Sequence, residues 1–111
     1  MKRLISAAFC ILISSQVFAD GIVTVIRVDA DGRGIVFFSP PTTQTIVGAC
    51  RDTVNYNNAL AFNTNTVGGK AFLAFAIAAK ASGAQVASYG TGACSIYSPY
   101  KIEDFNSAYL N

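Results

Sequence analysis

A single helix-forming segment lies between two stretches that favour β-strands, and this order restricts the fold more than any other feature. Asn65 or Thr66 can cap the start of the helix, and Gly83 is the residue type that follows a helix end. Four apolar residues share one helical face, which we expect to pack on a sheet: Phe72, Phe75, Ala76 and Ala79.

Segments rich in β-branched and aromatic residues flank this helix and predict the strands. They span 21–28, 35–38, 59–62, 85–89 and 95–110, the last giving one or two strands around Pro99. A glycine-containing turn at 29–34 joins the first two as a hairpin. The chain is therefore mainly β with one helix, in the order β-β-β-α-β-β. This is the order of an OB-type fold, a five-stranded, partly open barrel, and a small α+β sandwich is the alternative.

The first 19 residues have the layout of a secretory signal peptide. A basic start is followed by the apolar run 4–17, which is shorter than the roughly 20 residues of a membrane-spanning helix. The small residues Val17 and Ala19 then predict cleavage between Ala19 and Asp20. We expect an exported protein, periplasmic or secreted, with no membrane span after cleavage and one domain over 20–111.

Removing the leader changes the charge balance. The whole chain has 8 basic and 6 acidic residues, and Lys2 and Arg3 leave with the leader, so six of each sign remain. No basic excess remains for binding nucleic acid. A neutral surface also tolerates self-association.

The residue types available for catalysis are few. The chain has no histidine, which removes the commonest general base and metal ligand. Glu103 and Asp104 are adjacent, so in a strand they would point to opposite faces, and we expect both to be solvated. Asp29 and Asp31 fit a hairpin turn better than a calcium loop, because Arg33 stands where a further ligand is needed. We predict no enzyme activity, no cofactor and no metal site.

Two cysteines remain after cleavage, Cys50 and Cys94. In a small exported chain they are expected to form one disulfide. Two free thiols are the alternative, whereas a metal site is not expected because no histidine or further cysteine can complete a tetrahedral site.

Tyrosines and asparagines form the candidate ligand site. Aromatic faces pack on the apolar side of a sugar ring, and amides and hydroxyls supply directional hydrogen bonds. Ordinary strand and loop positions are the alternative interpretation. The candidates are Tyr56, Asn57, Asn58, Tyr97 and Tyr100.

The side of the helix opposite the predicted core is not polar. Its small residues are Ala71, Ala74, Ala78 and Ala81. Alanine is the best helix former, which explains the composition without any partner. Small side chains also allow close helix approach, so this alanine strip is a candidate interface of a homo-oligomer.

Four segments resemble a family of small exported bacterial proteins similar to the B subunit of subtilase cytotoxin. They are ALAFNTNT at 59–66, GKA at 69–71, AAKASG at 78–83 and YGTGAC at 89–94. The resemblance implies an OB-type fold, export, a disulfide and a ring of five subunits that binds glycans. The toxin subunits use a serine near the first strands, where 21–28 offers only Thr24, so no binding residue is carried over.

These observations predict an exported, non-enzymatic binding module whose ligand is a glycan or another envelope molecule. A periplasmic structural protein that engages an envelope protein is the alternative.

Overall fold

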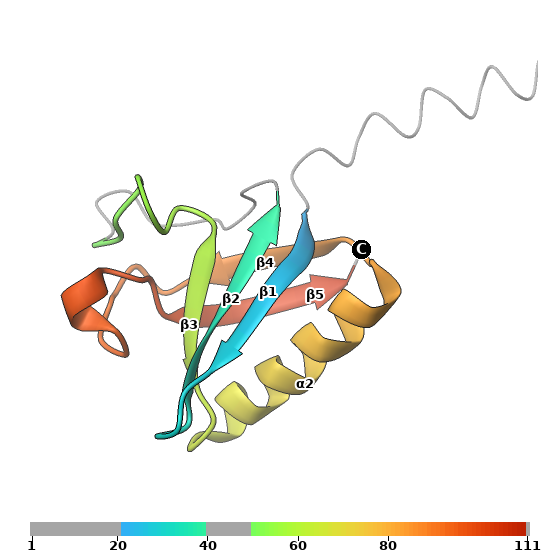
Figure 1. The fold of residues 1–111 in the computed structure, drawn as a ribbon, viewed down its shortest axis with the longest axis horizontal. Coiled ribbons are helices and arrows are strands. Elements are labelled where there is room, and N and C mark those ends of the chain that lie inside the picture. Colours follow the sequence, from blue (N-terminus) through green and yellow to red (C-terminus); the bar gives the residue numbers. More distant parts are fainter. Residues whose placement is uncertain (1–20, 40–49, 111) are drawn as a thin grey trace, which may run out of the picture.

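The computed structural model describes residues 21–39 and 50–110, and the leader with its Ala19–Asp20 cleavage position lies outside them. In chain order the elements are β1 (Ile22–Val28), β2 (Arg33–Ser39), β3 (Ala59–Asn63), α2 (Val67–Ser82), β4 (Val86–Gly90), the 3-10 turn η1 (Ser98–Tyr100) and β5 (Phe105–Leu110). Figure 1 shows α2 lying alongside the strands. The predicted mainly-β order with one α-helix between the third and fourth strands is confirmed for the described residues.

The strands form two antiparallel sheets, β1-β2-β3 and β4-β5. The sheets are joined by isolated bridges, antiparallel between Gly21 and Val86 and parallel between Ala61 and Asp104. The described strands therefore form no closed barrel, and the arrangement fits the small α+β alternative.

The turn between β1 and β2 forms as the sequence predicts. Asp29 N–H donates to the Arg33 carbonyl at 2.7 Å, and Gly32 N–H donates to the Asp29 carbonyl at 3.0 Å. Gly32 has a φ of +93°, a conformation that glycine adopts without steric cost. The Asp31 carboxylate accepts from Arg33 N–H at 3.1 Å, so it stabilises the turn.

The capping residues define α2. Thr66 accepts a hydrogen bond from Gly69 N–H, and Gly83 ends the helix in the left-handed conformation. The buried face consists of Gly69, Phe72, Ala76 and Ala79, whereas Phe75 is only half-buried at its flank. Phe72 stacks on Phe105 of β5 with ring centroids 3.8 Å apart.

The two faces of the β1-β2-β3 sheet have different partners. Val36 and Phe38 of β2 join the core that α2 covers. Ile35, on the other face, packs with Tyr97 and Ile102 from the connection between β4 and β5. Side chains along a strand point alternately to opposite faces, so β2 contributes to both clusters.

The connection before β5 corrects one expectation. Residues 95–100 are not a strand, because they end in η1, and only 105–110 pair with β4. Pro99 lacks the N–H that a sheet ladder requires. Lys101 then turns the chain with a φ of +56°. The turn brings Tyr97 opposite Ile102.

Candidate functional site

Three tyrosines from two distant parts of the chain line one hollow. Tyr56 belongs to the loop before β3, whereas Tyr97 and Tyr100 belong to the connection between β4 and β5. Figure 1 shows these two segments at the same end of the molecule. The hollow has a volume of about 110 Å³ and is lined by Arg27, Ile35, Tyr56, Tyr97, Tyr100 and Ile102.

The floor of this hollow is buried and its rim is exposed. Ile35 and Ile102 are buried, and Tyr97 is 3% exposed. Tyr100, in contrast, is 59% exposed, and Arg27 is also exposed. A ligand group that enters the hollow therefore meets both an aromatic ring and a guanidinium group at the rim.

A second hollow of about 620 Å³ adjoins the first, because Tyr56 and Tyr100 line both. Its other lining residues are Asp52, Asn55, Pro99 and Lys101. It therefore combines aromatic rings with a carboxylate, an amide and an ammonium group. We call the two adjoining hollows the tyrosine site.

Hydrogen bonds hold Tyr97 in place. Its hydroxyl donates to the Asp29 carboxylate, which also accepts from Arg27 Nε at 2.8 Å. The bond from Tyr97, followed by that from Arg27, lowers the pKa of Asp29. Burial and the bond to Asp29 raise the pKa of Tyr97 to about 12, so the phenol stays protonated at neutral pH. The Arg33 guanidinium lies 4.5 Å from the centre of the Tyr97 ring.

Asp52 organises the loop that carries Tyr56. Its carboxylate accepts from Val54 N–H at 2.9 Å and from the Asn55 side-chain amide at 3.0 Å. These bonds, those from Asn55 first, lower the pKa of Asp52. Tyr56 N–H in turn donates to the Asp52 carbonyl at 2.9 Å.

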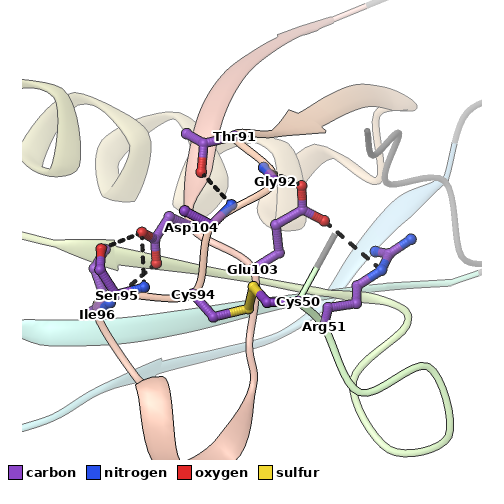
Figure 2. The surroundings of a disulfide bond; sticks show 10 residues. Cys50, Arg51, Thr91, Gly92, Cys94, Ser95, Ile96, Glu103 and Asp104 are labelled. Atoms are coloured by element: carbon purple, nitrogen blue, oxygen red, sulfur yellow. Dashed lines mark hydrogen bonds and ion pairs between the residues drawn. A yellow bond between two sulfur atoms is a disulfide. The ribbon is translucent and has the colours of Figure 1, made fainter. Parts of the chain in front are cut away.

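The disulfide joins the two segments that form the site. Cys50 and Cys94 are bonded with their Cα atoms 6.0 Å apart, which confirms the predicted pair. Figure 2 shows Arg51 directed toward Glu103 beside this bond. Asp52 N–H also donates to the Lys101 carbonyl at 2.9 Å. The Tyr56 loop is thus tied covalently and by hydrogen bonding to the segment that carries Tyr97 and Tyr100.

Glu103 and Asp104 are buried, so the expectation of two solvated charges was wrong. Glu103 Oε2 accepts from Gly92 N–H at 2.8 Å, and its Oε1 lies 3.7 Å from Arg51 Nε. Asp104 accepts from the backbone N–H groups of Ser95 and Ile96 (Figure 2). Both carboxylates hold the connection between β4 and β5, and burial without such partners would be costly.

The other candidate residues lie elsewhere. Asn58 donates from its side chain to the Phe38 carbonyl at 3.0 Å, and the Asn57 carbonyl accepts from Arg51 at 3.1 Å. Neither lines the two hollows. The four residues of the alanine strip are exposed on α2, on the side away from its buried face: Ala71, Ala74, Ala78 and Ala81.

Sequence reasoning missed several residues of the tyrosine site. Arg27, Asp52 and Lys101 resemble ordinary surface charges in the sequence, and no local pattern marks them. Ile102 stands between Lys101 and Glu103 in a segment that predicts a strand, and nothing local marks it as part of a site. The proximity of the cysteines to these residues in the sequence was the available signal, because a disulfide between them brings 51–58 close to 95–102.

Within 21–39 and 50–110, no three side chains that could bind a metal ion form a cluster. In the same residues, no helix is both long and apolar enough to cross a membrane. Comparisons with protein-family models, with curated proteins and with solved structures found no match for the chain.

Proposed function

We propose that the chain is an exported, non-enzymatic binding module that recognises a saccharide at the tyrosine site. The observation that carries the proposal is the shared wall of the two hollows, formed by Tyr56 and Tyr100. Aromatic rings can pack on the apolar face of a sugar, while Asp52, Asn55 and Lys101 can hydrogen-bond its hydroxyl groups.

The strand connections support an OB-type, partly open barrel as the underlying fold. β1 meets β4 at the Gly21–Val86 bridge, and β3 meets β5 in parallel at the Ala61–Asp104 bridge. OB-folds bind oligosaccharides and oligonucleotides on the face of strands 2 and 3, between the β1–β2 and β4–β5 loops. The tyrosine site combines Ile35 of β2 with Tyr97 of the β4–β5 connection, and Tyr97 is hydrogen-bonded to Asp29 of the β1–β2 turn. The neutral mature charge favours a saccharide over a nucleic acid.

Export is supported by the leader and by the disulfide, since disulfides persist in oxidising compartments. The resemblance to the toxin B subunits adds the expectation of glycan binding. The lack of histidine favours recognition over catalysis.

The test is a screen of residues 20–111 on an array of neutral and acidic glycans, with two variants. Tyr100→Ala removes an exposed ring shared by both hollows, and we expect it to abolish the binding of every glycan that the unaltered protein retains. Tyr89→Ala removes a tyrosine of β4 outside both hollows, and binding should persist. The proposal fails if no glycan binds, or if Tyr100→Ala binds as well as the unaltered protein.

Self-association through α2 is a second candidate function, because the exposed side of this helix is largely apolar, with Lys70 and Lys80 as its charged residues. Besides the alanine strip it carries Val67 and Ile77, which are exposed. Light scattering during size exclusion should then give a five-subunit mass for 20–111. Ala78→Glu should lower this mass, whereas Thr53→Glu, on an exposed loop, should not. A monomer would contradict the proposed ring.

A further inference from the structure

The cations around the smaller hollow already have carboxylate partners. Arg27 Nε lies 2.8 Å from Asp29 Oδ1, and Arg33 Nε lies 2.7 Å from Asp31 Oδ2. Asp29 accepts a further hydrogen bond from Tyr97, so it is held toward both Arg27 and Tyr97. An anionic ligand would have to compete with these carboxylates for the guanidinium groups.

The larger hollow is also balanced in charge. It contains one carboxylate, Asp52, and one ammonium group, Lys101. The Asp52 carboxylate already accepts hydrogen bonds from the Asn55 side chain and the loop backbone. The positive charge of Lys101 contributes to lowering the pKa of Asp52. The charges of the tyrosine site sum to zero when Asp29, which lines neither hollow and pairs with Arg27, is counted with Arg27, Asp52 and Lys101. Electrostatic attraction would select neither an anion nor a cation.

The two hollows differ in size, so each would hold a different part of one ligand. Small-molecule sites commonly measure about 300–1,000 Å³, a range that includes the larger hollow and excludes the smaller one. The smaller hollow, at about 110 Å³, has room for a substituent and not for a whole sugar ring. Its lining is both apolar and polar, because the buried Ile35 and Ile102 meet the Arg27 guanidinium, whose N–H groups are donors.

Building on the proposed function, we propose that the tyrosine site takes an uncharged 2-acetamido sugar. The acetamido methyl group enters the smaller hollow and contacts Ile35 and Ile102. Its carbonyl oxygen accepts hydrogen bonds at the rim, and the sugar ring lies against Tyr100 in the larger hollow. The volume, the combination of isoleucine side chains with a polar wall, which matches the methyl and carbonyl groups of an acetamido substituent, and the paired cations together carry this assignment.

Matched sugar pairs test the proposal. Chemical-shift titrations of 20–111 use the N-acetyl forms of glucosamine, galactosamine and mannosamine, each against its parent hexose, with N-acetylneuraminic acid as the anion. We expect at least one acetamido sugar to bind about tenfold more tightly than its parent, a factor that a single additional buried carbon group can produce. The dissociation constant should not change between low salt and about 0.5 M NaCl, because screening acts on charged ligands.

A variant of the smaller hollow tests whether the acetamido group binds there. Ile102→Ala enlarges the smaller hollow and should reduce the preference for the acetamido sugar over its parent. A second variant, Ile35→Val, keeps more of the floor and should retain most of the preference. Because Ile102 is buried, heteronuclear NMR spectra of each variant must first show the native fold.

The outcomes separate this inference from the proposed function. If sugars bind with no preference for the acetamido group, or if the anion binds most tightly, the inference is overturned and saccharide binding stands. If the glycan array and the titrations both give no binding, the proposed function fails as well. Lost preference in Ile102→Ala with the parent hexose still bound supports the assigned position of the acetamido group.

Discussion

The Tyr97 hydroxyl donates a hydrogen bond to the Asp29 carboxylate across 68 residues of sequence. This bond joins the β1–β2 turn to the connection between β4 and β5. The Tyr97 ring lies against Arg33 and lines the smaller hollow. One interaction thus serves the packing of the fold and the shape of the candidate site.

Removing this bond should destabilise the protein. We expect Tyr97→Phe to lower the free energy of unfolding by about 1–2 kcal/mol, because a buried ring loses its hydrogen bond to a charged group. Tyr100→Phe changes an exposed tyrosine on the same turn and should have almost no effect. Urea unfolding of both variants gives the comparison, and equal stability of the two would contradict the role of the Asp29 bond.

The hydrogen bond between Tyr97 and Asp29 also predicts how the free energy of unfolding depends on pH in the acidic range. The folded state lowers the pKa of Asp29, so this contribution is present above the ordinary pKa of 3.8 and is lost as pH falls through the folded value. Asp29→Asn should therefore flatten the stability curve below about pH 4. The measurement is the urea midpoint as a function of pH. An unchanged acid slope in Asp29→Asn is the opposing result.

At alkaline pH the dependence should have the opposite sign, so that the free energy of unfolding falls as pH rises. The pKa of Tyr97 is raised from 10.0 to about 12 in the folded state. Its contribution is full below pH 10 and is lost as pH rises toward 12, because the unfolded phenol ionises first. Tyr97→Phe should lose stability less steeply than the unaltered protein across this window. Parallel slopes for the two proteins would show that Tyr97 is not responsible.

Gly90 should be intolerant of a side chain because of Glu103. A Cβ at position 90 would meet carboxylate atoms of Glu103, the nearest Oε2. Because Glu103 is buried between Gly92 and Arg51, it has little freedom to move, so Gly90→Ala should destabilise the protein by roughly 1–3 kcal/mol.

The control for this prediction is another glycine. A Cβ at Gly68 of α2 would meet nothing within 4 Å, so Gly68→Ala should be neutral or stabilising by about 0.5–1 kcal/mol. Thermal unfolding of both variants provides the test. The prediction also requires a coupling, in that Gly90→Ala should cost less in a Glu103→Ala background. Additive effects in this double-mutant cycle would contradict the proposed clash.

Loss of the disulfide should lower stability without erasing the fold. The bond closes a chain segment with a sequence separation of 44 residues, which the chain-entropy model values at about 4 kcal/mol. We expect the Cys50→Ser and Cys94→Ser double variant to show a correspondingly lower urea midpoint. Because the bond ties the Tyr56 loop to the Tyr97 segment, amide exchange in 51–58 should also accelerate. Unchanged exchange there would show that hydrogen bonds alone hold the loop.

Several elements could be predicted because their signals are local. The β-branched run in 21–28 and the glycines of the next turn indicate a hairpin, and Thr66 and Gly83 indicate the ends of α2. In contrast, the isoleucine and tyrosines of 95–100 suggested a strand, and Pro99 overrode this preference. The burial of Glu103 was also missed, because its partners Arg51 and Gly92 come from other parts of the chain.

By itself, the sequence determined the order of strands and helix, the cysteine pair and the hairpin between β1 and β2. These depend on side-chain periodicity, capping and turn chemistry within a few residues. Only the tertiary structure decided that Arg27, Tyr56 and Tyr97 line one hollow, and that Asn57 and Asn58 do not. The physical reason is that such proximity depends on strand pairing and on one disulfide between distant segments, and no local preference of the chain encodes the resulting distances.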